Sequence, residues 1–384
     1  MTDISTCLVG HPFAPIGRGE DVRCTFRALR SVAVRPGVLD LYRINRPDSE
    51  VLEEIQPFLT TSPGKLNIFH LNGDEIEQAL ETLGDRLPND SYNIIYPAWE
   101  LSQYPSAWAE QLNRFDEVWA PTQFIFDALR PVISKPLIRM PLACEVVLSS
   151  FRSRRYFGIP ESSYAFLFFF DFRSYVARKN PGAAIKAFEL LRRQRPTADV
   201  CLVIKTHGSH AAPQALAALT EAIAPLRDRV VLVDQAMTDN DTKNLVHCCD
   251  AFVSLHRSEG FGRGLAEAMY LGKPVIATAY SGNLDFMDGD CAYLVDYNLI
   301  PVKPGEYPHA ENQVWAEANL EQAVGHMVTL TDCADDGRQL GKRASQKIRD
   351  SVGFRAAGIR YRDRLDQIHE TLRPENSHDQ SNAS

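Results

Sequence analysis

Residues 254–287, SLHRSEGFGRGLAEAMYLGKPVIATAYSGNLDFM, predict a strand, a glycine-rich loop, a helix and a second strand in direct succession. Residues 251–256 are short, apolar and rich in strand formers, as is typical of a buried parallel strand. Residues 265–271 are helix formers that end at Gly272, and residues 275–278 form the next strand. This order predicts a parallel α/β sheet whose helix N-terminus lies at the carboxyl edge, where open α/β folds bind ligands.

The loop of this unit combines glycines with two carboxylates. Gly260, Gly262 and Gly264 let the backbone turn tightly and approach a ligand, and the amides at the helix start favour a phosphate. Glu259 lies at the strand exit and Glu267 lies near the first turn of the helix, so both can face one crevice. The set suits an anionic, hydroxyl-rich ligand such as a sugar nucleotide. The alternative is an ordinary crossover whose glutamates are solvated.

Residues 166–188, FLFFFDFRSYVARKNPGAAIKAF, predict the first central strand of a second domain and the helix that follows it. Asn180 is a favoured N-cap and Pro181 suits the first helical position. Arg173 and Lys179 lie on the connecting loop. Two cations at that place can meet a diphosphate from two sides.

Together these residues resemble the retaining glycosyltransferases of family 4. The matching features are R-x5-K from Arg173 to Lys179, E-x7-E from Glu259 to Glu267, the GFG turn and the strand GKPVIAT, and they cover about residues 160–300. The resemblance implies an α/β protein of the GT-B fold, with two Rossmann-like doubly wound parallel-sheet domains that face a central cleft.

The resemblance also implies roles for single residues. Arg173 and Lys179 are expected to bind the donor diphosphate, Glu259 to lie beside the transferred sugar, and Glu267 to accept hydrogen bonds from the ribose hydroxyls. The expected phosphate site is completed by the loop and helix start, which comprise Gly260, Phe261, Gly262, Arg263, Gly264 and Leu265. Arg263 departs from the family pattern, which often has proline or a small residue there. Two alternatives stay open for its side chain, contact with phosphate or exposure to solvent.

The N-terminal half is less distinctive. Gly17 and Gly19 follow a predicted first strand and resemble the loop that packs against the donor phosphates in these transferases, with a plain turn as the alternative. Further strands are predicted at 66–71, 92–96 and 117–120, and their polar ends are placed on the acceptor side. The titratable candidates on that side are His70 and Glu100, each with a structural role as the alternative.

The domain organisation follows from these strand sets. We predict an acceptor-binding domain over residues 1–150, a nucleotide-sugar-binding domain over 151–351, a helix at 352–373 that packs back onto the first domain, and a disordered tail over 374–384. In the second domain, Lys205 ends a strand that faces the expected donor site. It is interpreted either as a second phosphate contact or as a lysine that extends along the surface.

Composition excludes several classes of protein. With 384 residues, 45% of them hydrophobic and 23% charged, the chain suits two globular domains, and its net charge of −8 argues against general nucleic-acid binding. It has no 18-residue apolar run and no signal-peptide pattern. Eight scattered cysteines without C-x-x-C spacing indicate reduced thiols. We therefore expect a cytoplasmic protein, with peripheral association with the inner membrane face as an open alternative.

The predicted activity follows from the resemblance. It is the transfer, with net retention, of a hexose-type sugar from a UDP-, GDP- or dTDP-type donor to a hydroxyl of a glycan or lipid-linked acceptor in bacterial surface polysaccharide synthesis. No D-x-D lies in a plausible binding loop, so neither a metal nor another cofactor is expected. The alternatives are a sugar-nucleotide epimerase, with Glu259 and His70 or Glu100 as acid and base, and a non-catalytic nucleotide-sugar-binding subunit.

Overall fold

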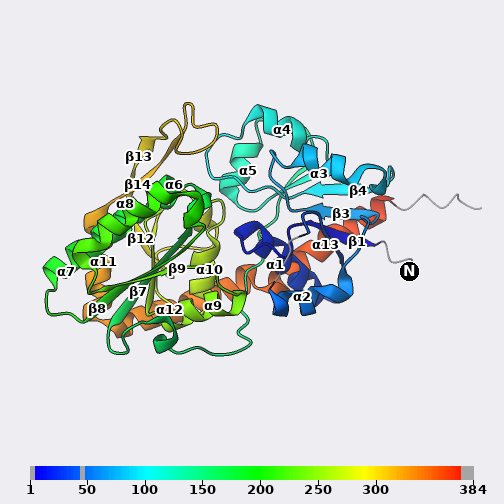
Figure 1. Ribbon diagram of the computed structural model, residues 1–384. Coiled ribbons are helices and arrows are strands. Elements are labelled where there is room, and N and C mark those ends of the chain that lie inside the picture. The colour runs from blue at the N-terminus through cyan, green and yellow to red at the C-terminus, as the bar shows by residue number, and fades with distance from the viewer. Residues whose placement is uncertain (1–4, 44–47, 373–384) are drawn as a thin grey trace, which may run out of the picture.

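The computed structural model describes residues 5–43 and 48–372. Two α/β halves lie side by side, each with a sheet between layers of helices (Figure 1). The predicted tail over 374–384 lies outside the described residues. No helix in the described ranges is long and apolar enough to cross a bilayer.

The first sheet has six parallel strands in the order β2-β1-β3-β4-β5-β6. The strands are β1 (Thr6–Gly10), β2 (Gly37–Asp40), β3 (Leu66–Phe69), β4 (Tyr92–Ile95), β5 (Glu117–Ala120) and β6 (Leu137–Arg139). The helices of this half are α1 (Gly17–Ser31), α2 (Ser49–Ile55), α3 (Ile76–Leu83), α4 (Ser106–Leu112) and α5 (Gln123–Leu129), with 3₁₀ turns η1 (Gln56–Phe58) and η2 (Gly84–Arg86). Strands β1, β3 and β5 are buried along their whole length, which a parallel sheet covered on both faces requires.

The second sheet has six parallel strands in the order β12-β11-β10-β7-β8-β9. They are β7 (Tyr164–Asp171), β8 (Val200–His207), β9 (Val230–Asp234), β10 (Ala251–Ser254), β11 (Val275–Thr278) and β12 (Tyr293–Val295). The helices are α6 (Val176–Lys179), α7 (Pro181–Gln194), α8 (Pro213–Ile223), α9 (Asp239–Cys248), α10 (Arg263–Tyr270) and α11 (Leu320–Asp332), with 3₁₀ turns η3 (Arg154–Phe157), η4 (Phe172–Ser174), η5 (Ser209–Ala211), η6 (Ala224–Leu226) and η7 (Gly282–Asp285). The chain order reverses between β7 and β10, so their carboxyl ends form a topological switch point, the usual place for a ligand. The predicted GT-B fold is confirmed, and the predicted boundary between residues 150 and 151 falls between β6 and β7.

The start of α7 differs in detail from its prediction. Pro181 occupies the first helical position as expected, and Asn180 occupies the N-cap position. However, the Asn180 backbone is left-handed, with φ of 52°, and its side chain does not cap the helix. Its side-chain amide donates to Glu317 Oε1 at 3.1 Å instead.

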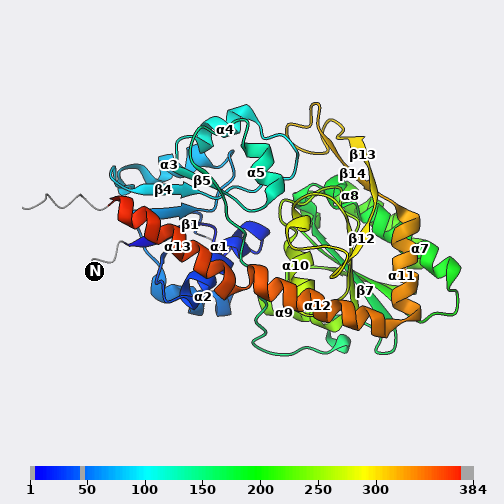
Figure 2. The same ribbon diagram turned by 180° about the vertical axis from the view of Figure 1, so that it is seen from behind.

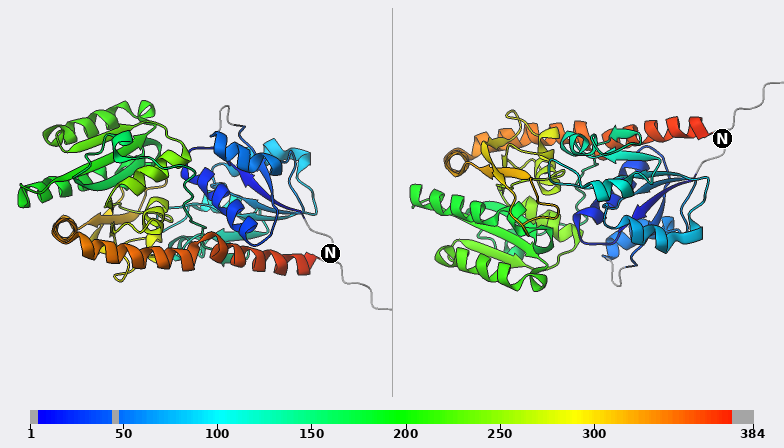
Figure 3. Two further views of the ribbon diagram at one scale, coloured as in Figure 1. Left: turned by 90° about the horizontal axis from the view of Figure 1, so that it is seen from below. Right: turned by 90° about the horizontal axis from the view of Figure 1, so that it is seen from above.

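Two C-terminal helices connect the halves. Helix α12 (Ala334–Val352) packs on the second half and α13 (Phe354–Leu372) returns to the first, so that together they run along one side of both (Figures 2 and 3). Close packing of α13 on α1 requires Gly358, since a Cβ there would lie 2.2 Å from the Ala28 carbonyl oxygen. The Tyr361 hydroxyl donates to the Pro141 carbonyl at 2.8 Å and anchors α13 to the end of the first domain.

An antiparallel hairpin projects from the second half toward the side of the first half that carries α4 and α5 (Figures 1 and 2). We call residues 297–318 the arm; it consists of β13 (Tyr297–Pro301), β14 (Val314–Ala318) and the segment between them. The Gln313 amide donates to the Gln103 carbonyl at 2.8 Å, which ties the arm to the first domain. The arm was not among the elements predicted from the sequence.

Candidate active site between the two sheets

A cavity of about 840 Å³ opens between the two halves. The first half contributes the start of α1 and residues that follow β3, β4 and β5, and the second half contributes residues at the ends of β7, β8 and β10 and the start of α10. Its volume lies within the range of small-molecule sites.

Most of the predicted site residues line this cavity. They are Gly17, Glu100, Arg173, Lys179, Lys205, Glu259, Gly260, Phe261, Gly262, Arg263, Gly264, Leu265 and Glu267. The fold therefore brings together residues that lie more than 240 positions apart in the chain.

Two predicted residues do not line the cavity. Gly19 lies in the first turn of α1, not in a loop, and a Cβ there would lie 2.2 Å from the Ala14 carbonyl oxygen. This glycine therefore serves a close backbone contact within the first domain. The His70 ring is fully buried beside Tyr96, and burial holds the His70 pKa well below its usual value. A neutral imidazole enclosed in the core is not placed to contact an acceptor in the cavity.

Glu259 is held by two cations. Lys179 Nζ lies 2.5 Å from Glu259 Oε1, and Arg178 Nη1 lies 3.1 Å from Glu259 Oε2. The Glu259 backbone N–H donates to Ser281 Oγ at 2.8 Å. Burial alone would raise the pKa of Glu259, but the charges of Lys179 and Arg178 outweigh it and bring this pKa to about 2. The carboxylate is therefore ionised at neutral pH and has a defined orientation.

Arg178 is a site residue that the sequence analysis missed. Its side chain is only 5% exposed, and it joins Glu259 to Glu100 of the first domain, with 3.6 Å between Arg178 Nη2 and Glu100 Oε1. Arg178 Nη1 also donates to the Ser258 carbonyl at 2.9 Å. The adjacent pair of cations at 178 and 179 was the available signal, but the sequence does not show which of the nearby arginines turns inward.

Arg173 lies at the rim of the cavity. Its guanidinium donates to Asp171 through Nε at 3.0 Å and Nη2 at 2.8 Å, and its side chain is 47% exposed. His207 also lies within 3.0 Å of Asp171 Oδ2. The charge of Arg173 is thus largely balanced by its neighbour in the chain, and its contact with a diphosphate stays a prediction.

The start of α10 faces the cavity. Gly262 precedes the helix with φ of +90°, a backbone conformation that favours glycine. A Cβ on Gly264 would lie 2.5 Å from the Phe169 ring, so this glycine allows α10 to pack onto β7. The first backbone N–H groups of a helix have no intrahelical acceptor, and here they belong to residues that line the cavity.

Arg263 joins the two domains. The prediction left open whether its guanidinium contacts phosphate or points to solvent. The structure buries the guanidinium against α1, where Nε donates to Asp21 Oδ1 at 3.2 Å. It also donates to the Ala143 carbonyl at 3.2 Å and lies over the Phe261 ring. Because Asp21 belongs to the first domain, only the packed structure could show this partner.

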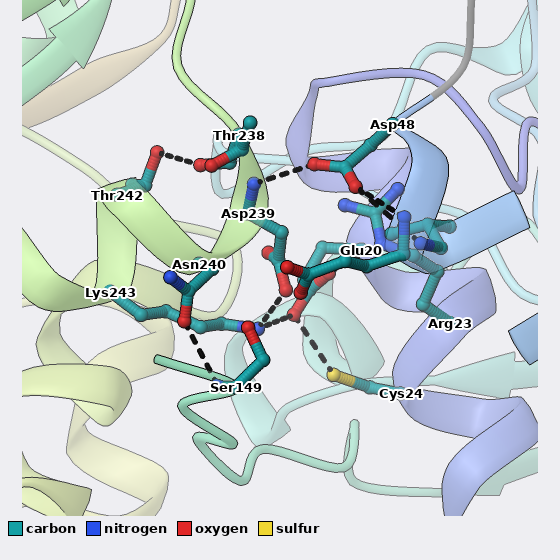
Figure 4. Close-up of polar contacts among 12 residues, drawn as sticks. Glu20, Arg23, Cys24, Asp48, Ser149, Thr238, Asp239, Asn240, Thr242 and Lys243 are labelled. Carbon is teal, nitrogen blue, oxygen red and sulfur yellow. Dashed lines mark hydrogen bonds and ion pairs between the residues drawn. The ribbon is translucent and has the colours of Figure 1, made fainter. Parts of the chain in front are cut away.

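A second buried ion cluster links α1 with α9 (Figure 4). Lys243 is 1% exposed, and its ammonium donates to Glu20 Oε1 at 2.9 Å and to Asp239 Oδ2 at 2.6 Å. Glu20 also accepts from Arg23 Nε at 2.7 Å. Burial opposes the ionisation of Glu20, but Lys243 and Arg23 hold its pKa well below the usual value. Sequence reasoning missed Lys243 because a lysine in a polar helix normally faces water.

Glu267 and Lys205 complete the inner wall. Glu267 is buried, and this burial, together with the charges of Glu20 and Asp239, raises its pKa to about 7 against the opposing charges of Lys243 and Arg263. Lys205 is also buried, which lowers the pKa of its ammonium, so it does not extend along the surface. Lys205 therefore meets the geometric requirement of the phosphate alternative.

Comparisons with known proteins agree with this geometry. Residues 165–301 match the family model described as Glycosyl transferases group 1. No curated protein matches the chain in sequence. Among solved structures, Anabaena HepE in complex with UDP and glucose is similar with a TM-score of 0.70 and 13% identity, over 95% of this chain and 100% of that one.

Two further structures match nearly the full length of this chain. Sucrose-phosphate synthase from Thermosynechococcus elongatus has a TM-score of 0.64 and 15% identity, over 96% of this chain and 100% of that one. A glycosyltransferase from Rickettsia africae has a TM-score of 0.65 and 12% identity, over 98% and 100%. The chain therefore has the GT-B fold, and its residues 165–301 are similar to the group 1 glycosyl transferases.

Proposed function

We propose that the protein is a retaining glycosyltransferase that moves a hexose-type sugar from a nucleoside diphosphate to a hydroxyl of a glycan or glycolipid acceptor. The observation that carries this proposal is the ionised Glu259, oriented by Lys179 and Arg178, beside the start of α10 in a cavity shared by two domains. The match of residues 165–301 to group 1 glycosyl transferases supports it.

The donor diphosphate would lie between Lys179 and the first amides of α10. A helix N-terminus and a fixed cation both favour phosphate, and Lys205 and Arg173 line the same cavity, Arg173 at its rim. Glu267 would accept hydrogen bonds from the ribose hydroxyls. The cations Lys179, Lys205 and Arg173, together with the amides of α10, supply the positive charge that a divalent metal would otherwise bring to the diphosphate. We therefore propose a metal-independent reaction without another cofactor.

In the proposed reaction, the bond between the anomeric carbon and the diphosphate oxygen breaks and its electron pair leaves with the phosphate. The acceptor hydroxyl attacks from the same face, and its proton passes to the departing phosphate. Preorganised cations and amides stabilise the charge that develops on this leaving group. Glu259 would orient the hydroxyls of the transferred sugar. Its carboxylate is suited to this because Lys179 and Arg178 hold it in a fixed position.

An assay with and without acceptor separates this function from its alternatives. Release of nucleoside diphosphate that rises when a saccharide acceptor is added supports a transferase. A changed sugar in donor recovered without acceptor would instead indicate an epimerase, and binding without turnover would indicate a binding subunit. By resemblance, we place the reaction in bacterial surface polysaccharide or glycolipid synthesis at the cytoplasmic side of the membrane.

UDP is expected to stabilise the protein more than GDP, dTDP or ADP. The reasoning is that HepE, which shares the fold, binds UDP and UDP-glucose. At a concentration of 100 times its dissociation constant, a ligand stabilises the folded state by about 2.7 kcal/mol. A thermal-shift panel of the four nucleotides measures this, with Lys179→Ala as the variant that should lose most of the shift. No shift with any of the four would contradict the donor site.

Binding of the nucleotide sugar is expected to weaken as pH falls from 8 to 6. The pKa of Glu267 is about 7, so the carboxylate takes up a proton in this range. Its neutral form accepts weaker hydrogen bonds from the ribose hydroxyls, which predicts a loss of about three- to tenfold in affinity. The diphosphate diester does not titrate in this window, so titration calorimetry reports the protein. Glu267→Gln should flatten the profile, whereas a flat wild-type profile would contradict the ribose contact.

A further inference from the structure

One part of the cavity wall has no role in the proposed donor site. It combines aromatic rings with carboxylates and an amide from both halves of the molecule: Asn72, Asp74, Glu100, Trp108, Tyr175 and Tyr307. Tyr307 belongs to the arm, so this wall exists only where the arm meets the first domain.

Tyr175 has an unusual backbone for an aromatic residue. Its φ is +60° and its ψ is +91°, a backbone conformation that residues other than glycine rarely adopt. Its side chain is nevertheless 42% exposed, and its ring centroid lies 4.7 Å from that of Tyr307. Such a conformation costs about 1–3 kcal/mol and is concentrated at sites that hold ligands. The strained backbone therefore belongs to a partly exposed aromatic residue that lines the cavity.

Trp108 and Asp74 form the facing part of the wall. A Cβ on Gly73 would lie 2.5 Å from Trp108 Cβ, so the loop that carries Asp74 packs directly on the indole. His309 of the arm packs edge-on against the same indole, with 4.9 Å between ring centroids. Asp74 remains exposed, and the negative charges of Asp74 and Glu100 both act on the Tyr175 hydroxyl across the cavity.

This wall is connected to the carboxylate at the centre of the site. The Tyr307 hydroxyl donates to Glu100 Oε2, Glu100 pairs with Arg178, and Arg178 donates to Glu259. A ligand held against Tyr307 would thus be linked to Glu259 through Glu100 and Arg178.

We propose that this wall is the acceptor subsite and that it takes an uncharged sugar ring, with the aromatic faces of Tyr175 and Trp108 against the ring and Asp74 on its hydroxyls. The inference rests on the proposed glycosyltransferase function and names its acceptor class as a saccharide. Aromatic faces bury the apolar side of a ring while neighbouring acceptors bind its hydroxyls.

The charges on this wall argue against other occupants. An acyl chain laid against Asp74 would take this exposed carboxylate out of water without offering it a hydrogen bond, which is costly. The phosphate of a lipid phosphate would face the like charges of Asp74 and Glu100, and Arg178 is already engaged by two carboxylates. A neutral glycan avoids both costs, because its hydroxyls donate to Asp74 and it brings no negative charge to the wall.

Saturation-transfer NMR on the whole protein tests the subsite with the methyl glycosides of glucose, galactose, mannose and N-acetylglucosamine, each with UDP at saturation. We expect at least one glycoside to bind, and Tyr175→Ala and Trp108→Ala to weaken it at least tenfold. Tyr175→Phe, which keeps the ring, should retain binding. Tyr156→Ala is the matched control, since Tyr156 is an exposed tyrosine that does not line the cavity.

The outcomes separate the subsite from the function. Equal glycoside binding in all variants, failure of every glycoside to bind the UDP-saturated wild type, or preferential binding of decyl phosphate would each overturn the saccharide subsite. Failure of every nucleotide to bind would overturn the proposed donor site instead. Unchanged UDP affinity in Tyr175→Ala and Trp108→Ala shows that the loss is local to the subsite.

Discussion

Glu259→Gln and Lys179→Ala are each expected to lower kcat by about two orders of magnitude or more. Single preorganised electrostatic contacts with a developing charge are worth this much. The glutamine is isosteric but cannot balance the charges of Lys179 and Arg178, which the ionised carboxylate now does at 2.5 and 3.1 Å. The alanine removes the ammonium that would stabilise the leaving diphosphate.

The measurement is acceptor-dependent release of nucleoside diphosphate, with kcat and KM determined separately. Lys186→Ala provides the matched control, because Lys186 lies exposed on α7 and pairs only with Glu189 among the described residues. Circular dichroism shows whether the fold survives in both variants. Nucleotide affinity should be retained in Glu259→Gln and should fall in Lys179→Ala, which separates the loss of turnover from the loss of donor binding. Near-normal turnover in both variants would remove Glu259 and Lys179 from the proposed mechanism.

Lys243→Met is expected to destabilise the protein by about 3–5 kcal/mol. Removing one partner of a buried ion pair leaves an uncompensated charge, and this penalty exceeds the value of the pair itself. Here the ammonium lies between Glu20 and Asp239, and Glu267 is a third carboxylate within its field. Because Glu20 belongs to the first domain and Lys243 to the second, the loss should also loosen the packing of the domains.

Urea unfolding of the wild type, Lys243→Met and the surface control Lys342→Met measures the change. Adding Glu20→Gln to Lys243→Met should recover part of the loss, since it removes one of the stranded charges. A change below about 1 kcal/mol in the free energy of unfolding of Lys243→Met, equal to that of the control, would contradict this prediction. It would show that water or movement of the helices compensates for the lost ammonium.

Local signals in the sequence located many of the regular elements. The strands at 117–120 and 275–278 agree with β5 and β11 residue for residue, and the helix predicted at 352–373 corresponds to α13 at Phe354–Leu372. The GFG turn immediately precedes α10 as predicted, and Glu267 lies on this helix as its fifth residue, slightly beyond the predicted first turn. These features depend on neighbours within a few positions, such as an apolar run between turn residues or a glycine next to a helix former, and such patterns are written directly in the chain.

Partner choice could not be predicted in the same way. Arg173 was predicted as a site cation and Arg178 was passed over, yet Arg173 pairs with Asp171 at the rim while Arg178 reaches Glu100 and Glu259 in the core. Arg263 meets Asp21, although 241 residues separate them in the chain. A cation takes whichever anion the packing places nearest, and that distance is set by the whole fold.

The amino-acid sequence alone was sufficient for the fold class, the strand–loop–helix unit around Glu259 and Glu267, and the cations near the second domain's first strand. Only the tertiary structure decided which of those cations holds Glu259, that Lys243 is buried between α1 and α9, and that the arm brings Tyr307 to the first domain. The reason is that secondary structure is governed by short-range propensity and periodicity. Burial and ion pairing depend instead on contacts between segments that come together only when both domains and the arm have packed.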